Sequence, residues 1–327
     1  MQRYDHYIAV DWSMSSMAIA RLTGENERLS LKETPASVAD LKAYLKSLRG
    51  RKILTVEESN SSQWLYVELN SHVDKFLMCD PHRNRLLSDG PKTDKIDAKK
   101  LVHLLKAGLM KEVFHTADET IYLRKLTSHY QDLVRMGVMK KNQRSALFRS
   151  YGLCHKKDNF SGNHSLEGFV LGHLDIQIQS YEEIKKEYEA KFKEFAKSSK
   201  NARLLKSIPG VGDVHAVELL ALIVDAKRFP TLGHLYSYAG LIRHEKISGG
   251  RYYGDRKPRS SHELKRVMKM ITYAALRGSE NKVTKYYRHL IEKGVAGHNA
   301  RHACTRKIAA YTYGILRTER KLEPSKY

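Results

Sequence analysis

The sequence predicts an α/β domain at its N-terminal end, a pair of long helices in the middle and a mostly α-helical domain at its C-terminal end. Short apolar runs, each ended by a turn, fill the first third of the chain. The middle third repeats apolar residues at helical spacing over several turns. Glycine- and proline-containing turns divide further helical stretches in the last third. The expected domain boundaries are 1–115, 116–200 and 201–327.

The first domain is expected to begin with three strands and to continue as alternating helices and strands. The expected strands are Tyr7–Asp11, Met17–Leu22, Arg28–Lys32, Ile53–Val56 and Phe76–Cys79, and the expected helices are 37–48, Trp64–Leu69 and 94–108. Ser37 followed by Asp40 is a helix-start signal. This element order, with the first strand central, resembles the ribonuclease-H fold of RuvC-like proteins.

The middle of the chain predicts two long helices that face each other. Their apolar positions recur at steps of three and four, and they are Leu123, Leu126, Tyr130, Leu133, Val134, Tyr181, Ile184, Tyr188, Phe192 and Phe195. A polar segment near 152–172 is expected to join them. A hairpin within one chain and a dimerising coiled coil are equally open alternatives, because the repeats span only about two to three heptads. In the last third, a helix is expected within Leu205–Ala226 after the segment Ile208–Gly212, and further helices near 262–277 and 301–318, with a basic, turn-rich section at 243–259.

The charge of the chain points to nucleic acid. Its 58 lysines and arginines outnumber 36 acidic residues, so the formal net charge is +22. Residues 201–327 alone carry a net charge of +15, as expected of a polyanion-binding surface. No apolar run approaches ~20 residues, which argues against a membrane span. The three cysteines lie far apart and the first residues are polar, which predicts a cytoplasmic protein without a zinc site.

Four acidic residues stand where a nuclease of this fold would need them. Asp11 and Glu57 end two of the expected strands, and Asp94 and Asp97 lie three residues apart at the start of an expected helix. Carboxylates gather mainly when a hard cation neutralises them, so these four residues predict a Mg²⁺ site. Glu58 competes with Glu57, because strand register decides which of the two faces the cleft. Each acid taken singly is more often structural, and Asp94 alone would be an ordinary helix-start acid.

The segment Ile208-Pro209-Gly210-Val211-Gly212 precedes an amphipathic helix. This pattern is typical of a helix-hairpin-helix motif, in which glycines let the backbone approach DNA and the N–H groups at the helix start bind phosphate. Gly210 and Gly212 are therefore candidate nucleic-acid contacts. The alternative is a tight turn between packed helices.

A serine beside two glycines, Ser248-Gly249-Gly250, lies within the basic section. Its basic neighbours are Arg243, Lys246, Arg251, Arg256, Lys257 and Arg259. A positive field of this kind would stabilise a serine alkoxide and a transferring phosphate, and it would bind a nucleic-acid backbone. On composition alone, a Ser-Gly-Gly sequence is more often a turn.

Taken together, these motifs resemble the insertion-sequence 110 family of transposases over nearly the whole chain. The N-terminal resemblance rests on Ile8-Ala9-Val10-Asp11, Val56-Glu57 and Lys92-Thr93-Asp94-Lys95-Ile96-Asp97-Ala98. The C-terminal resemblance rests on Ile208–Gly212, Phe229-Pro230, Tyr238-Ala239-Gly240-Leu241, Ser248-Gly249, Ala303–Ala309 and Tyr313–Leu316. The sequence departs from the family pattern after the glutamate, at Glu58-Ser59-Asn60, and after the serine, at Pro258-Arg259-Ser260-Ser261-His262.

The resemblance implies an RNA-guided recombinase. Asp11, Glu57, Asp94 and Asp97 would hold Mg²⁺, for which Mn²⁺ could substitute. Ser248 would form a phosphoserine with DNA, and Ser260 and Ser261 are weaker rivals for that role. A structured non-coding guide RNA of the bridge type would pair with donor and target DNA. The protein would assemble as a homo-oligomer, a tetramer of two dimers joined by the central helices, with the two domains meeting across protomers.

Two other functions fit the same residues. A hydrolytic, structure-selective DNA nuclease would use the four carboxylates alone and would not need Ser248. A nucleic-acid-binding scaffold with an inactive site would bind DNA in a salt-sensitive way and give no metal-dependent product. The four acids argue against the scaffold, and the setting of the serine together with the family resemblance argues against the nuclease.

Overall fold

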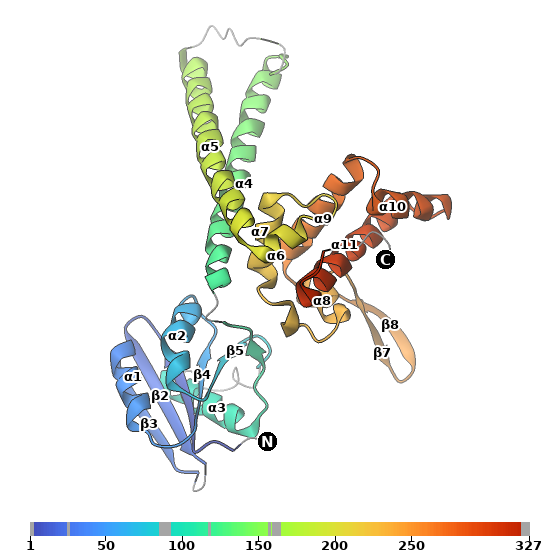
Figure 1. The fold of residues 1–327 in the computed structure, drawn as a ribbon. Helices are drawn as coiled ribbons and strands as arrows, with labels where there is room; N and C mark the ends of the chain where they lie inside the picture. The colour runs from blue at the N-terminus through green and yellow to red at the C-terminus, as the bar shows by residue number, and fades with distance from the viewer. Residues whose placement is uncertain are drawn as a thin grey trace. The chain divides into compact units, whose positions relative to one another are not determined.

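The computed structural model describes residues 3–24, 27–84, 93–116, 119–155, 158 and 165–321. By compactness the chain has two units, Met1–Asp118 and Glu119–Tyr327. The first unit is a mixed α/β domain and the second is mostly helical (Figure 1).

The first unit is built on one sheet with the strand order β3-β2-β1-β4-β5-β6. The strands are β1 (His6–Trp12), β2 (Ser16–Thr23), β3 (Leu29–Pro35), β4 (Lys52–Glu57), β5 (Lys75–Cys79) and β6 (Glu112–Val113). β1 is antiparallel to β2 and parallel to β4, and β4 is parallel to β5. The first strand therefore lies inside the sheet, as the sequence predicts. β6 escaped prediction because two residues cannot show an alternating pattern.

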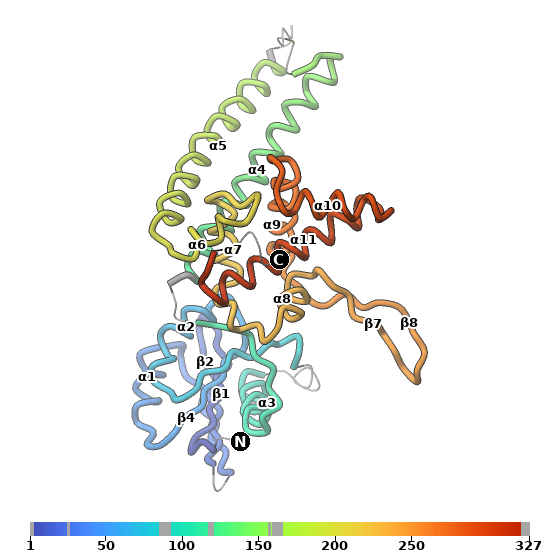
Figure 2. Tube along the Cα trace, turned by 45° about the vertical axis from the view of Figure 1, so that its right-hand side comes forward, coloured from blue at the N-terminus to red at the C-terminus, as the bar shows by residue number. Residues whose placement is uncertain are grey.

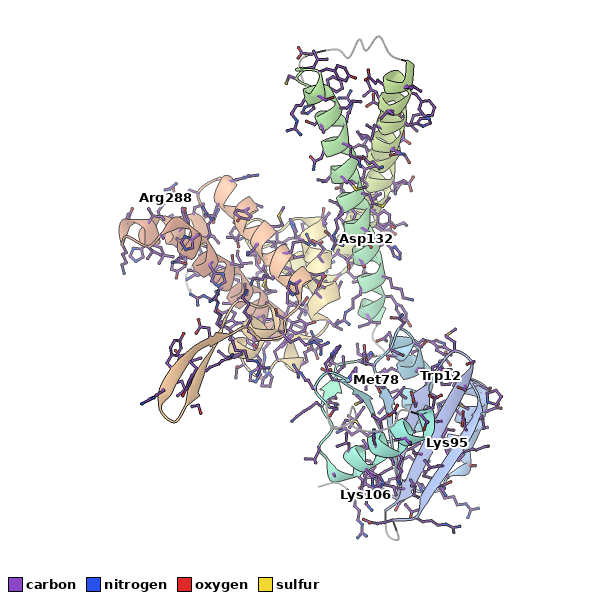
Figure 3. The ribbon with its side chains drawn as sticks, turned by 180° about the vertical axis from the view of Figure 1, so that it is seen from behind. Trp12, Met78, Lys95, Lys106, Asp132 and Arg288 are labelled. Atoms are coloured by element: carbon purple, nitrogen blue, oxygen red, sulfur yellow. The ribbon has the colours of Figure 1, made fainter. Side chains whose placement is uncertain are left out.

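Helices cover both faces of this sheet. They are α1 (Val38–Ser47), α2 (Ser62–Leu69) with the short 3-10 turn Asn70–His72, and α3 (Asp94–Ala107). Because side chains alternate along a strand, Ile8 and Val10 pack with the α1 side, whereas Ala9 packs with α3. Figure 2 shows α1 and α3 on opposite sides of the strands. Lys95 and Lys106, near the two ends of α3, are labelled in Figure 3.

The helix ends follow the sequence signals. The Ser37 hydroxyl accepts a hydrogen bond of 3.1 Å from the backbone N–H of Asp40, which caps α1 as predicted. α3 starts at Asp94 and ends before Gly108, whose φ of +67° places it in the left-handed region that favours glycine. The sequence therefore located both ends of the helix that carries two of the four acids.

In the second unit, two long helices, α4 (Leu123–Ser150) and α5 (Ser165–Ser198), pair within the chain. The ring of Tyr130 stands edge-on to that of Phe192, with the ring centres 5.0 Å apart, and its hydroxyl donates to Glu189 over 2.9 Å. An intramolecular helical hairpin is thus present, and pairing with a second chain stays a prediction. The predicted joining segment, 152–172, lies partly outside the described residues.

The rest of the second unit is a cluster of helices and one β-hairpin. Its elements are the 3-10 turn Glu119–Tyr122, α6 (Lys200–Leu205), α7 (Asp213–Ile223), the 3-10 turn Ala226–Arg228, α8 (Leu232–Tyr238), β7 (His244–Ser248), β8 (Arg251–Arg256), α9 (His262–Arg277), α10 (Lys282–Glu292) and α11 (Gly297–Thr318). The predicted helices at 262–277 and 301–318 are present in α9 and α11, and the helix predicted after Gly212 is present as α7. None of the described helices combines the length and hydropathy needed to cross a bilayer.

One hydrophobic core joins the base of the helical pair to the C-terminal helices. Phe192 and Ala196 of α5 and Ala202 and Leu205 of α6 are all buried in it. The boundary predicted at residue 200 therefore falls inside a compact unit, because the apolar face of α5 continues across it into the C-terminal core.

Candidate functional site

The register of the sheet brings Asp11 and Glu57 together. Val10 of β1 is the partner of Val56 in the parallel pair β1–β4, so Asp11 and Glu57 follow at the same edge of the sheet. Both lie on the face covered by α3, because Ala9, two residues before Asp11, and Ile53, four residues before Glu57, pack with that helix. The alternation of the two strands thus places both carboxylates on one side.

Asp94 and Asp97 occupy the first turn of α3. The Thr93 hydroxyl caps this turn, accepting a hydrogen bond of 3.3 Å from the N–H of Ile96. The Ser16 hydroxyl, at the start of β2, donates to the carboxylate of Asp94 over 3.4 Å. Because β2 is the neighbour of β1, this contact holds the helix start beside the strand that carries Asp11.

The pKa of Asp11 depends on the other three predicted acids. Burial raises the pKa of Asp11, and the charges of Asp94, Glu57 and Asp97 raise it further, to about 6. Each of the other three carboxylates is therefore near enough to repel a negative charge on Asp11. The sequence selected these residues from three separate segments, and the fold gathers them around one position.

A divalent cation fits this cluster by its chemistry. Carboxylate oxygens are the ligands that Mg²⁺ prefers, and an unneutralised group of four repels itself. In the positions described, no three Asp, Glu, His or Cys side chains stand close enough together to hold a metal ion. Movement of the side chains would therefore be needed to close a ligand set around an ion. Asp97 is also 3.9 Å from the ammonium of Lys100.

Glu57 and its rival Glu58 have different surroundings. The carboxylate of Glu58 lies 3.3 Å from Nε2 of His115. The His115 ring lies against Tyr66 of α2, with the ring centres 5.8 Å apart, on the face of the sheet away from α3. The geometry therefore favours Glu57 as the partner of Asp11.

A fifth acid of this sheet edge, Asp80, was not among the predicted site residues. It follows β5 and is buried. One of its oxygens accepts hydrogen bonds from the N–H groups of His82 and Arg83, at 3.0 and 3.3 Å. These bonds close the turn after β5, which gives Asp80 a structural role.

The two glycines of the predicted helix-hairpin-helix segment differ in their surroundings. Gly210 has a φ of +84°, and a Cβ there would lie 2.4 Å from the carbonyl oxygen of Ile271 and 2.7 Å from the nitrogen of Ala275, both in α9. Gly212 has an extended backbone at the N-cap of α7, and no described atom lies within 4 Å of its Cβ position. Gly210 thus serves packing of the turn on α9, while DNA contact at Gly212 stays a prediction.

The substitution Gly210→Ala is expected to lower the free energy of unfolding by about 3 kcal/mol, because it combines backbone strain at positive φ with a clash against helix backbone. Gly212→Ala is the matched control and should cost less than about 1 kcal/mol. Urea unfolding followed by circular dichroism measures both. Equal losses in the two variants would contradict the packing role of Gly210.

Ser248 lies at the tip of the β7–β8 hairpin. It pairs with Arg251 across a two-residue turn in which Gly249 and Gly250 have φ values of +55° and +74°, the conformation of a type I′ turn. The hairpin projects from the helices of its unit (Figure 1), and its residues are nearly all exposed. The section expected to be irregular turns is therefore a β-hairpin.

The predicted basic residues distribute along this hairpin. Lys246, Arg251 and Arg256 belong to its strands, whereas Arg243, Lys257 and Arg259 flank its base. The guanidinium of Arg243 lies 3.6 Å from a carboxylate oxygen of Asp255. Four further cations were not predicted, Lys265 and Lys269 of α9 and Arg301 and Arg306 of α11, and they line one pocket with Arg243, Lys257 and Arg259. Their spacing by four and five residues looks like an ordinary solvated helix face.

Two models of known protein families match parts of this chain. Residues 8–152 match a DEDD-type IS110 model described as "Transposase", and residues 202–288 match the model described as "Transposase IS116/IS110/IS902 family". An insertion element IS110 uncharacterized 43.6 kDa protein of Streptomyces coelicolor is 34% identical over 120 residues. That match covers 36% of this chain and 30% of the relative, so it spans less than a third of the relative's length. Since both models describe transposases of one kind and together match well over half of the sequence, the chain belongs to the IS110 family of transposases.

Proposed function

We propose that this protein is an RNA-guided DNA transposase that cuts and exchanges donor and target strands. The observation that carries the DNA-cutting part of this proposal is the gathering of Asp11, Glu57, Asp94 and Asp97 near one edge of a sheet. The strand order of that sheet, with β1 between β2 and β4, is the one expected of a ribonuclease-H or RuvC-like domain. Carboxylates at this edge are suited to phosphodiester chemistry.

In this proposal, Asp11, Glu57, Asp94 and Asp97 hold Mg²⁺, or Mn²⁺ in its place. The bound metal would supply positive charge where negative charge develops on the phosphate and the leaving oxygen. The raised pKa of Asp11 reflects the site without a cation, and all four groups need to be ionised to bind one.

Ser248 is the proposed nucleophile. Its Oγ would form a bond to the DNA phosphorus while the bond from phosphorus to a sugar oxygen breaks. The serine would give up its proton and the leaving sugar oxygen would take one up. Attack by the sugar hydroxyl of a second strand on the phosphoserine would restore the free serine and join the strands. Arg251, the hairpin partner of Ser248, would neutralise the phosphate.

The family resemblance supports a guide RNA and an oligomer. The net charge of +15 in residues 201–327 suits contacts to nucleic-acid backbones, while base pairing by a guide RNA would select the sequence. The proposed assembly is a tetramer of two dimers joined through α4 and α5. Exposed apolar side chains on α4, Met136, Val138 and Met139, are consistent with a further contact there.

The second candidate function is a hydrolytic, structure-selective DNA nuclease that uses the carboxylates alone. The exposed position of Ser248 at a hairpin tip favours the nuclease over a serine mechanism, because a serine nucleophile needs activation by its surroundings. The two functions differ in their products. Hydrolysis leaves free ends, whereas transposition leaves joined strands and a covalent intermediate.

A matched pair of glutamate substitutions tests the proposal. Glu57→Gln should lower the yield of recombinant DNA at least about 100-fold, equivalent to about 2.7 kcal/mol, because it removes a metal ligand. Glu58→Gln should stay within about threefold of wild type, because its carboxylate lies with His115. Donor–target junctions, counted by sequencing after expression with the flanking non-coding DNA, give the yield. A strong loss in Glu58→Gln alone would reject the proposed ligand set.

A further inference from the structure

A groove in the C-terminal unit is lined neither by Ser248 nor by the four carboxylates. It has a volume of about 1090 Å³ and runs between α9 and α11, with the segments on either side of the β7–β8 hairpin as its rim. We call it the α9–α11 groove. Its cationic lining consists of Arg243, Lys257, Arg259, Lys265, Lys269, Arg301 and Arg306, joined by the histidines His262, His298 and His302.

The floor of the groove is fixed by hydrogen bonds. The hydroxyls of Thr272 on α9 and Thr305 on α11 lie 3.1 Å apart, and both residues are buried. Nε2 of His302 lies 3.1 Å from the carbonyl oxygen of Leu241, to which it donates as N–H. The two helices and the rim segment are thus tied together, and the groove is a built feature rather than a gap between mobile side chains.

Positive charge predominates in the groove, although Arg243 at its rim lies 3.6 Å from a carboxylate oxygen of Asp255. The described lining includes no aspartate or glutamate. Burial lowers the pKa of Lys265, and the charges of Lys269, Lys257 and Arg243 lower it further. Crowding of like charges destabilises the empty groove, and an anion bound there would remove that cost.

The helix geometry adds to this charge. α9 has 16 residues and α11 has 22, and the first turns of both, at His262 and His298, line the groove. The N-terminal end of a helix carries a partial positive charge and free N–H groups. Two such ends, together with seven cationic side chains, favour a ligand with several successive negative charges over a single anion.

We propose that the α9–α11 groove binds the phosphates of one nucleic-acid strand, a role that rests on the proposed function. Pockets that hold small ligands span about 300–1,000 Å³. At about 1090 Å³ the groove therefore has room for a few nucleotides of one strand and not for a whole duplex. Tyr273 lines the same groove and is 44% exposed, which offers a face on which a base can stack.

Binding to the full-length protein tests this assignment. Labelled single strands of about 20 nucleotides, one DNA and one RNA of the same sequence, and the matching DNA duplex are titrated by fluorescence anisotropy without divalent metal, between about 50 and 200 mM salt. The test variant is Lys265→Gln/Lys269→Gln/Arg301→Gln. The control, Lys186→Gln/Lys193→Gln/Lys197→Gln, removes the same charge from exposed positions of α5.

The groove variant is expected to bind a single strand at least about tenfold more weakly than the control. The slope of log affinity against log salt should fall by about 2, because each lost phosphate contact contributes about 0.7. Loss for the RNA strand alone assigns the groove to RNA, and loss for the DNA strand alone assigns it to DNA. Equal binding by the two triple variants, or a loss confined to the duplex, would overturn the proposal.

The single substitution Lys269→Gln guards against misfolding, because Lys269 is exposed. It should keep the thermal midpoint of wild type and lower the slope by about 0.7, and an unchanged slope in the folded variant would also overturn the proposal. The measurement needs neither the carboxylates nor Ser248. Failure of strand binding therefore differs from failure of the proposed transposase chemistry, which appears in junction yield and covalent products.

Discussion

Ser248→Ala is expected to eliminate covalent attachment of DNA to the protein and to lower recombination by about 10⁴-fold or more, the scale seen when a catalytic nucleophile is removed. Alanine has no Oγ with which to bond phosphorus. The fold should not change, because Ser248 is exposed and the turn that follows is formed by Gly249 and Gly250. Loss of adduct would therefore report chemistry rather than unfolding.

The adduct assay uses the chain expressed with its flanking non-coding DNA and with donor and target plasmids. After denaturation, DNA that stays attached to protein is detected by probing. Ser260→Ala is the informative control, because Ser260 is the rival that lines the α9–α11 groove. Ser261 is less suitable, since its hydroxyl caps α9 by accepting from the N–H of Leu264 over 3.2 Å.

Three results of this assay lead to different conclusions. An adduct that is lost in Ser248→Ala and kept in Ser260→Ala supports the proposed mechanism. The reverse pattern moves the nucleophile into the groove. Cut DNA without any adduct, unaffected by Ser248→Ala, favours the hydrolytic nuclease that uses the carboxylates alone.

Most of the sheet domain could be predicted because its central strands are buried on both faces. Residues such as Ile8, Val10, Leu54 and Val56 are fully or almost fully buried, so the apolar pattern of their strands is strong. The β7–β8 hairpin has no such pattern, because both of its faces are exposed. Its only sequence signal was the Gly249–Gly250 pair, which also fits a plain turn.

The helix α10 was not predicted, although the sequence contains a signal for its start. α10 begins at a capping box in which Asn281 accepts from the N–H groups of Val283 and Thr284. An asparagine before an apolar-periodic stretch is a helix start.

The candidate sites also differ in how far the sequence alone could predict them. Asp11 and Glu57 could be placed together from sequence, since the ends of parallel strands meet at one edge. The choice between Glu57 and Glu58 needed the register. The α9–α11 groove could not be predicted, because its cations come from α9, α11 and the hairpin base, segments that only tertiary packing brings together.

Asp11→Asn is expected to stabilise the metal-free protein while it removes recombination activity. The folded state raises the pKa of Asp11 from 3.8 to about 6, so folding opposes ionisation of this group. At 1.36 kcal/mol for each pKa unit, and discounted for partial exposure to solvent, the effect is about 1–2 kcal/mol. Asparagine has a similar shape without the charge, and it avoids repulsion by Asp94, Glu57 and Asp97.

The pH dependence fixes the sign of this prediction. Between pH of about 4 and 6 the folded protein binds more protons at Asp11 than the unfolded chain, so its stability falls as pH rises through that window. The gain from Asp11→Asn should therefore be small near pH 4 and complete above pH 6. Thermal unfolding in the presence of a chelator at several pH values measures it. Asp132→Asn, at an exposed position labelled in Figure 3, is the control and should stay within about 0.5 kcal/mol.

Added Mg²⁺ should reverse the order of stability. Wild type gains stability by binding the ion, whereas Asp11→Asn lacks one charged ligand and gains less. A variant that is less stable than wild type at pH 7.5 in chelator would show that the four carboxylates do not repel one another, and the metal site would then be wrong. The combination of higher stability with lost activity is what separates a charge cluster kept for catalysis from one kept for folding.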